Sequence, residues 1–262
     1  MTSEAGRPTV VWKSLLLLSL GLGVSVALPA ADALQGNWSG RFALPPGGRV
    51  AVENIHGNLV VEGWDRAEVD VVVTKKALAA TGRLADVRVG VEFGPQSLTF
   101  RTLYPGDLEE PVQVDYRLRV PRQVRLEGLR TLQGDITVRA VDGSIDARSL
   151  SGNIVDENVS GRVVAHALTG NVVATLRSLP APGAALVLDT VNGDVDLMLP
   201  PRPNADVDVN TVAGEVVSNY VFTTDAALGD TTRRVRLGNG GVKVSLQTVR
   251  GNIRVGERCN QL

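Results

Sequence analysis

The chain has 262 residues, which is enough for one elongated domain or two small ones. Aromatic residues make up only 4%, and the formal net charge of −1 arises from both signs mixed along the sequence. This balance argues against a nucleic-acid-binding surface. Cys259 is the only cysteine, so no intrachain disulfide can form.

The N-terminus has the pattern of an export signal. Arg7 and Lys13 precede an uncharged apolar stretch at 14–28, and Ala33 ends an A-x-A site. We expect residues 1–33 to be a signal peptide cleaved after Ala33, which predicts a location in the periplasm or at the cell surface. The alternative is an uncleaved anchor, but the apolar stretch is shorter than the roughly 20 residues of a membrane span.

The segment after the signal is expected to be extended and then to form strands. Residues 34–48 are rich in turn formers and are interpreted as a lead-in. Residues 49–125 alternate apolar and polar positions and predict the longer strands of an N-terminal part that caps the domain. Residues 77–85 are compatible with a short helix or a loop. Strands are expected at 86–93, 97–103 and 112–120.

From residue 126 the sequence is organised by a nonapeptide repeat, which begins at five evenly spaced glycines: Gly134, Gly143, Gly152, Gly161 and Gly170. Two positions after each glycine stands a β-branched residue: Ile136, Ile145, Ile154, Val163 and Val172. Seven positions after the first four glycines stands a second apolar column: Val141, Leu150, Val159 and Leu168. A fixed short period of this kind is typical of a coiled repeat architecture.

Each unit reads as a short strand followed by a turn. β-branched residues suit a pleated surface, and glycine after a polar residue suits a turn with positive φ. Asp156 interrupts the small or apolar residues found four positions after the other glycines, so we expect that column to be only partly buried.

One unit alone is unstable. Two or three buried aliphatic side chains contribute perhaps 3–9 kcal/mol. Ordering the unit's backbone costs about 9–18 kcal/mol. Only stacking between neighbours reverses that balance. The predicted fold is therefore all-β, a single-stranded β-helix or β-solenoid over residues 49–256.

A looser signature, polar–x–aliphatic–x–Gly, extends the pattern beyond the strict repeats, to Gly57, Gly193, Gly214 and Gly251. Its spacings favour about two nonapeptide units per coil over three. We expect two stacked columns, one of Ile136, Ile154, Val172, Val195 and Val216, and one of Ile145, Val163, Leu186 and Val207. Residues 218–240 interrupt the period as an insertion or loop, and 257–262 form a polar tail.

The order of these pieces carries a family resemblance. The residues concerned are VENIHGNLVVEGWD at 52–65, LRVP at 118–121, the serial units from Gly134, and QTVRGNIRV at 247–255. The chain resembles the bacterial "putative adhesin" β-solenoid family, related to the head (GIN) domain of auto-transporter adhesins. The resemblance implies an exported β-helix with an adhesive role, and it implies no catalytic residues.

The polar residues of the repeats are the first candidates for a calcium-binding or catalytic site. Nonapeptide repeats that bind calcium carry double glycines and an aspartate column, and both are missing here. Two units per coil would align Asp135, Asn153, Asn171 and Asp194 with Glu215 in one ridge, close to Asp196. A polysaccharide-active enzyme needs clustered carboxylates, whereas this ridge is expected to be a solvated edge. We therefore predict no catalytic, metal or cofactor site, and treat Asp135, Asn153, Asn171 and Asp194 as weak surface-binding candidates.

The remaining reactive residues lack the context that chemistry needs. His56 and His166 are expected in different coils, which disfavours a metal pair. Ser151 and Ser160 lack the strand–turn–helix setting of a hydrolase nucleophile. Cys259 is expected to be an incidental thiol. Two tryptophans are candidates for glycan contact, Trp38 and Trp64, although Trp64 is better explained as a cap of the first coil.

These observations favour a non-enzymatic exported scaffold of the bacterial envelope that binds a surface, glycan or protein partner through its long faces. The alternative is an envelope sensing or regulatory module, and a polysaccharide-active β-helix enzyme ranks third. We expect no nucleic-acid partner and no cofactor. Contact with a membrane is expected only through an uncleaved signal segment.

Overall fold

The computed structural model describes residues 37–78, 84–105, 112–224 and 232–258. All of them belong to one unit, residues 31–262. The secondary structure of these residues consists of strands, which confirms the all-β prediction. No helix in the described ranges is long and apolar enough to cross a membrane. The predicted signal peptide, the central part of 77–85 and Cys259 lie outside the described residues.

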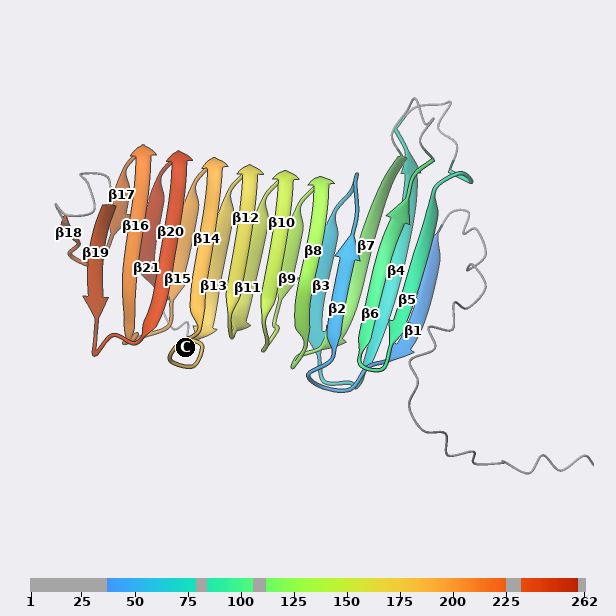
Figure 1. Ribbon diagram of the computed structural model, residues 1–262, viewed down its shortest axis with the longest axis horizontal. Helices are drawn as coiled ribbons and strands as arrows, with labels where there is room; N and C mark the ends of the chain where they lie inside the picture. Colours follow the sequence, from blue (N-terminus) through green and yellow to red (C-terminus); the bar gives the residue numbers. More distant parts are fainter. Residues whose placement is uncertain (1–36, 79–83, 106–111, 225–231, 259–262) are drawn as a thin grey trace, which may run out of the picture. The chain divides into compact units, whose positions relative to one another are not determined.

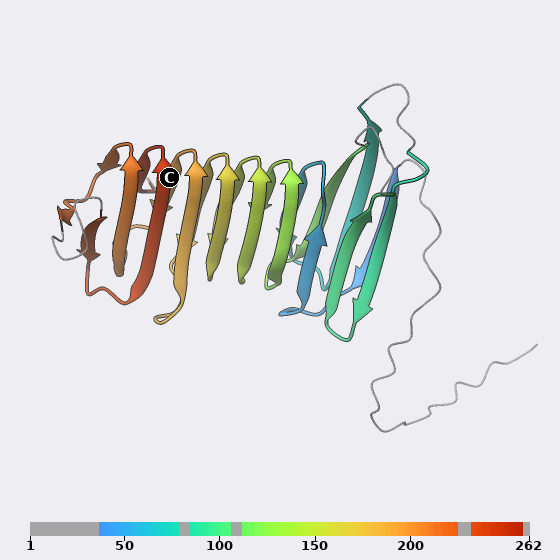
Figure 2. The ribbon, with the colours of Figure 1, turned by 45° about the horizontal axis from the view of Figure 1, so that its top comes forward.

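The strands form two sheets that lie face to face (Figures 1 and 2). In spatial order, the described strands of sheet A are β1 (Trp38–Ala43), β4 (Glu68–Ala77), β7 (Val112–Pro121), β3 (Leu59–Trp64), β9 (Ile136–Arg139), β11 (Ile154–Ser160), β13 (Val172–Ser178), β15 (Val195–Leu199), β21 (Ile253–Glu257) and β17 (Val216–Ser218). Those of sheet B are β18 (Thr223–Thr224), β19 (Thr232–Leu237), β16 (Ala205–Ala213), β20 (Val242–Arg250), β14 (Ala185–Asn192), β12 (Val163–Thr169), β10 (Ile145–Ser151), β8 (Arg125–Gln133), β2 (Arg49–Glu53), β6 (Ser97–Leu103) and β5 (Arg88–Gly94).

From β8 to β15 the chain passes alternately between the two sheets, and each strand pairs in parallel with the strand two further along. Ile154 pairs with both Ile136 and Val172, and Val172 pairs with Val195. On sheet B, Ile145 pairs with Val163. The predicted alignment of units two apart in the sequence is therefore confirmed in this region.

Towards the C-terminus the predicted columns are wrong by one member each. Ile253 of β21 lies between Val195 and Val216, because it pairs with both. Val244 of β20 lies in the same way between Leu186 and Val207. A free parallel edge accepts any strand of matching register, so the last two strands occupy the place that chain order would give to β16 and β17.

At the N-terminal end, too, the order of the strands in the sheets differs from their order in the chain, and the outer strands pair in a different direction. β2 lies between β6 and β8, and β3 lies between β7 and β9. Further out the strands become antiparallel, as β1 pairs with β4, β4 with β7, and β5 with β6. The predicted strands at 86–93, 97–103 and 112–120 are confirmed as β5, β6 and β7.

Aromatic rings pack between the two sheets at this end. Phe42 of β1 lies 5.2 Å from Phe93 of β5 and 6.0 Å from Phe100 of β6, measured between ring centroids. Large rings fit between the sheets at this end because it lies outside the stack of repeats. Residues 117–219, which include the repeats, contain no Phe, Trp or Tyr.

The core lies between the two sheets and consists of the inward-facing aliphatic side chains of successive strands. Ile136, Ile145, Ile154 and Val172 are fully buried, as the two-residue alternation of a strand predicts. Asp156 is fully buried as well, so the expectation of a partly buried column was wrong. Its neighbours across the ladder are Val138 and Ala174, and neither carboxylate oxygen has a hydrogen-bond partner.

The described parts of the interruption at 218–240 extend sheet B. β19 pairs antiparallel with β16, and two ion pairs support this register: Arg236 with Asp206 at 2.7 Å and Arg234 with Asp208 at 2.5 Å. The hydrogen bond from Arg236 holds the pKa of Asp206 below its usual value. β19 thus covers an edge of β16 that would otherwise be open to another chain.

Candidate binding surfaces

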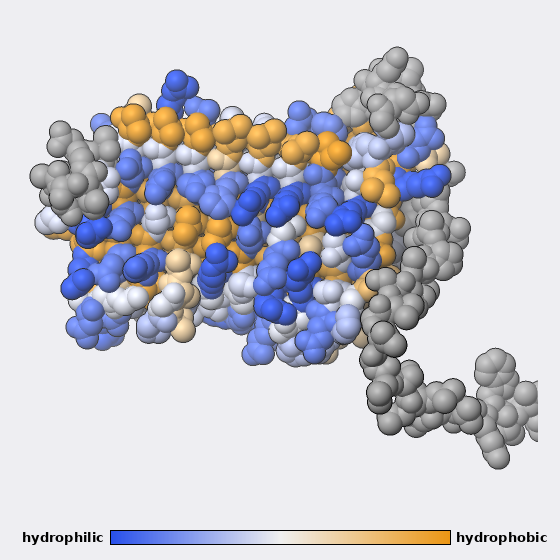
Figure 3. Space-filling model, viewed as in Figure 1, coloured by the Kyte–Doolittle hydropathy of each residue, from blue (hydrophilic) through white to orange (hydrophobic). Residues whose placement is uncertain are grey.

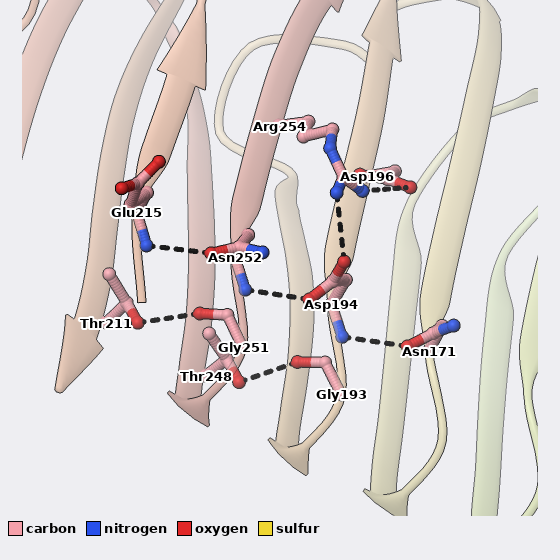
Figure 4. Close-up of polar contacts among 10 residues, drawn as sticks. All are labelled: Asn171, Gly193, Asp194, Asp196, Thr211, Glu215, Thr248, Gly251, Asn252 and Arg254. Atoms are coloured by element: carbon pink, nitrogen blue, oxygen red, sulfur yellow. Dashed lines mark hydrogen bonds and ion pairs between the residues drawn. The ribbon is translucent and has the colours of Figure 1, made fainter. Parts of the chain in front are cut away.

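The polar residues that follow the glycines leading into the sheet A strands form, together with Asp115, a continuous ladder on sheet A. We call these residues the Asx ladder; in spatial order they are Asp115, Asn58, Asp135, Asn153, Asn171, Asp194, Asn252 and Glu215. The backbone N–H of each member donates to the side-chain oxygen of the member before it, over 2.7–2.9 Å. Figure 4 shows the part of the ladder from Asn171 to Glu215. The structure therefore brings together Asp135, Asn153, Asn171 and Asp194, the four candidates predicted from the sequence.

The bonding of the Asx ladder explains why Asp and Asn occur at this position. Their short side chains reach a backbone N–H one layer away, and a longer or apolar side chain would leave that N–H without a partner. Each such bond contributes about 1 kcal/mol. One side-chain oxygen of each inner member accepts a hydrogen bond from the backbone of the next layer. The ladder therefore joins neighbouring layers where the chain passes from sheet B to sheet A, and its side chains do not converge on a reactive site.

A column of buried hydroxyl groups stabilises the same turns between sheet B and sheet A from the core side. Each donates to the carbonyl oxygen of a repeat glycine over 2.8–3.2 Å, and the donors are Thr131, Ser149, Thr190, Thr248 and Thr211. Figure 4 shows the bonds from Thr248 to Gly193 and from Thr211 to Gly251. Ala167 occupies the equivalent position in β12 and lacks the hydroxyl.

Arg254 is the main charged neighbour of the Asx ladder. It lies 3.1 Å from Asp194 and 3.0 Å from Asp196, as Figure 4 shows. The two carboxylates raise the pKa of Arg254 above its usual value. All three side chains are at least a quarter exposed, so these ion pairs contribute little to stability.

An exposed stripe of aliphatic side chains lies near the carboxyl ends of the sheet B strands, two residues before the glycines that lead into sheet A. We call it the aliphatic ridge; in spatial order it is Leu132, Leu150, Leu168, Val191, Val249 and Val212. These residues are 37–66% exposed. Figure 3 shows the apolar stripe along the top of the molecule, with polar residues beneath it. Six half-exposed aliphatic side chains present on the order of 400 Å² of apolar surface, as much as the largest patch on a typical monomer.

A second candidate surface lies on the outer face of sheet A. We call it the polar hollow, a depression of about 480 Å³ over β3, β4 and β7. Val60 and Val72 flank Arg117 in adjacent strands and form its apolar part. The remaining lining is polar and includes Asn58, Thr74, Asp70, Asp115 and Arg119.

Two polar groups of the hollow are free for a ligand. Within the described residues, the Arg117 guanidinium and the Thr74 hydroxyl have no hydrogen bond or ion pair. Asp70 faces Arg41 at 3.6 Å, and Arg119 lies over the ring of Trp64 at 5.9 Å. The hollow therefore combines an apolar floor with donors and acceptors on its rim.

A row of charges of alternating sign runs from the hollow across sheet A, in the spatial order Arg41, Asp70, Arg119, Glu62, Arg139 and Glu157. Arg139 and Glu157 form an ion pair at 2.6 Å. Opposite charges directly across neighbouring strands are favourable and like charges are not, so this row also fixes the register of the sheet.

The other residues singled out from the sequence lie apart from one another. His56 contacts Gln133 at 3.0 Å, whereas His166 contacts Asp189 at 2.6 Å in a different layer. The Ser160 hydroxyl donates to Asp142, and Ser151 is exposed at the end of β10. No group of three or more His, Cys, Asp or Glu residues in the described ranges is arranged to hold a metal ion.

The two tryptophans considered for glycan contact are half-buried at the N-terminal end. The Trp64 indole N–H donates to the carbonyl of Glu68 over 2.8 Å, and the Arg66 guanidinium lies 5.0 Å from its ring centroid. Trp38 packs against Phe42, with ring centroids 6.1 Å apart. Both rings are thus engaged within the protein.

No protein-family model and no curated protein matches the chain. Solved structures that it resembles include a "putative cell adhesion protein" from Clostridium sporogenes, with 11% identity over 85% of this chain and 100% of that chain, at a TM-score of 0.44. A "putative adhesin" from Bacteroides fragilis is 11% identical over 85% of this chain and 98% of that one, at 0.29. A "putative lipid binding protein" from Parabacteroides distasonis is 9% identical over 86% and 99%, at 0.28. The family resemblance drawn from the sequence therefore stays a prediction.

Sequence reasoning missed both the aliphatic ridge and the polar hollow. Leu150 and Leu168 belong to the same sequence column as Val141 and Val159, yet the valines are buried and the leucines are exposed. The hollow is formed by β3, β4 and β7, whose neighbourhood follows from the inverted strand order. No local sequence signal indicates either surface.

Proposed function

We propose that this chain is a non-enzymatic, exported β-solenoid scaffold that binds a hydroxyl-rich partner, such as a cell-envelope glycan, through the outer face of sheet A. The alternation of strands between two sheets, with each layer paired in parallel to the next, supports the solenoid part of the proposal. The predicted signal peptide supports the export part. The resemblance to the adhesin family agrees with a role in binding at the envelope.

The single observation that carries the binding role is the polar hollow. Its two valines offer an apolar floor of the kind that the C–H face of a sugar ring contacts, and Arg117 and Thr74 offer uncommitted donors beside it. A few convergent polar groups around an apolar floor are the usual features of a small-ligand site. Because the hollow lies on a two-layered β scaffold, the backbone positions of its residues are fixed before a ligand binds.

The proposal is tested by screening the purified chain against a panel of envelope and surface polysaccharides, with binding measured by calorimetry. We expect Arg117→Ala to weaken binding to the best ligand at least tenfold and Thr74→Ala to weaken it several-fold. Arg162→Ala is the matched control, because Arg162 is an exposed arginine outside the hollow. It is expected to leave the affinity unchanged.

Two results would count against the proposal. Equal affinity of the Arg117→Ala and Arg162→Ala variants would remove the hollow as the binding site. Release of shortened products from a polysaccharide would instead show that the chain is an enzyme.

A further inference from the structure

We propose that the aliphatic ridge is a self-association surface, through which two copies of this chain pair in an antiparallel arrangement about a two-fold axis. The inference is separate from the proposed glycan site, because the ridge belongs to sheet B and the polar hollow to the outer face of sheet A. Dimers joined at the ridge would carry two hollows.

The repeat distance of the ridge is the first argument for a second copy as the partner. Ridge side chains come from adjacent paired strands, so they recur about every 4.8 Å. A partner that contacts all six must present side chains with the same spacing. A second copy has the same spacing, so the side chains of the two ridges can interdigitate along their whole length.

The order of residue sizes is the second argument, and it sets the direction. The three leucines occupy one half of the ridge and the three valines the other. In an antiparallel pair Leu132 opposes Val212, Leu150 opposes Val249, and Leu168 opposes Val191, so each contact joins a large side chain to a small one. A parallel pair would put leucine on leucine at one end and valine on valine at the other, and the two copies could not stay in contact along the ridge.

The charges on the outer-face side of the ridge are compatible with the antiparallel pair. Two residues before each ridge residue, the outer face of sheet B carries a row that reads, in ridge order, Arg130, Arg148, His166, Asp189, Gln247 and Asn210. Antiparallel pairing brings Arg130 to Asn210, Arg148 to Gln247, and His166 to Asp189 of the other copy. No like charges meet in this row, and the chain's net charge of −1 gives little long-range repulsion.

The size of the ridge sets the expected strength. A standard interface buries about 800 Å² per partner, and the ridge supplies about half of that. The flanking polar rows must provide the rest, so we expect a reversible dimer in the micromolar range. A lipid surface is a poorer occupant, because the neighbouring Asx ladder carries Asp135, Asp194 and Glu215, which anionic headgroups would repel.

Sedimentation velocity of the purified chain over a range of concentrations tests the association. We expect a monomer–dimer equilibrium, weakened at least tenfold by Leu168→Asp, which places two like charges close to the axis. Val217→Asp is the matched control, since Val217 is an aliphatic residue of sheet A away from the ridge and is exposed to a similar degree, 54% against 45% for Leu168. Circular dichroism verifies that both variants remain folded, and Leu150→Ser serves as a milder ridge variant. A chain that stays monomeric at millimolar concentration, or equal effects of Leu168→Asp and Val217→Asp, would overturn the proposal.

Spin labels test the direction. With Gln133→Cys as the labelling site in a Cys259→Ser background, antiparallel copies hold the two labels five layers apart, on the order of 25 Å. Parallel copies would hold them within about 10 Å, and this shorter distance would overturn the antiparallel arrangement. The Leu168→Asp monomer also separates the two proposals, because it should keep its affinity for a soluble glycan while losing the gain from bivalent attachment to a surface.

Discussion

The middle of this protein and its two ends are built from the same repeat signature in different ways. From β8 to β15, strands that follow one another along each sheet in space also follow one another in the sequence. At the ends they do not: β2 and β3 lie inside β6 and β7, and β20 and β21 lie inside β16 and β17. Strands that carry the signature therefore extend the regular stack wherever they occur in the chain.

The difference shows what the signature encodes. The glycine, the Asx residue after it and the hydroxyl before it specify how one layer bonds to the next. They do not specify which layer comes next, because every layer offers the same partners. Most strands near the ends differ: β1, β4, β5 and β19 pair antiparallel, as expected for strands that close an end, whereas the terminal strand β17 pairs parallel with β21.

The largest expected effect lies in the middle, at Ile154. Ile154→Asp would bury an unpaired charge between two paired layers and should cost more than about 4 kcal/mol, which is enough to unfold the protein. The equivalent change at the C-terminal edge, Val216→Asp, concerns a half-buried residue of the short strand β17 and should cost under about 2 kcal/mol. Chemical denaturation followed by circular dichroism measures both, and equal costs would refute the contrast between middle and end.

The next effect concerns Asp156, the polar exception in the middle. Burial raises the pKa of this carboxyl from 3.8 to about 7. The folded state therefore binds the proton more tightly than the unfolded state, so this group lowers stability progressively as pH rises from about 4 to about 7 and by a constant amount above that. The full loss is about 4 kcal/mol.

Asp156→Val is accordingly expected to stabilise the protein. The gain in unfolding free energy over the wild type should be about 3 kcal/mol or more at pH 8 and much smaller at pH 4. Denaturant titrations of both proteins at the two pH values give the difference directly, and other carboxyl groups cancel in it. A gain that is independent of pH would mean that the pKa of Asp156 is the same in the folded and unfolded states.

Two glycines compare a stacked position with a free one. A Cβ on Gly152 would lie 2.0 Å from the carbonyl oxygen of Gly134 in the layer below, whereas a Cβ on Gly183 would meet nothing within 4 Å. Both have positive φ, at 150° and 91°. Gly152→Ala should therefore cost about 2 kcal/mol more than Gly183→Ala, since only the first must push two layers apart. Thermal unfolding of the two variants measures this, and similar melting temperatures would contradict the close stacking.

The smallest expected effect is at the Asx ladder. Asn153→Ala removes the acceptor for the backbone N–H of Asn171 and should cost about 1 kcal/mol. Asn153→Asp keeps an acceptor oxygen and is expected to cost less. Amide hydrogen exchange at Asn171 provides a local measurement, and unchanged protection in the alanine variant would mean that the ladder bond contributes nothing.

Much of the fold was predictable because the repeat restricts it so strongly. The inward positions of Ile136, Ile145 and Ile154 and their two-unit spacing follow from alternation and period alone. The prediction that Asp156 is only partly buried was wrong. It assumed that a carboxylate stays in contact with water, whereas this one is fully buried between the neighbouring layers. The four candidates Asp135, Asn153, Asn171 and Asp194 were correctly aligned, but their bonding to the backbone was not predicted.

By itself, the sequence determined the strand, the turn and the spacing at which one layer matches the next, because these depend on residues that are close neighbours along the chain. Only the tertiary structure decided the order of the layers at the two ends, the exposure of Leu150 and Leu168, and the joining of β3, β4 and β7 around one hollow. Parallel edges with identical hydrogen-bonding patterns are interchangeable locally. The choice among them is made by the packing of the whole domain.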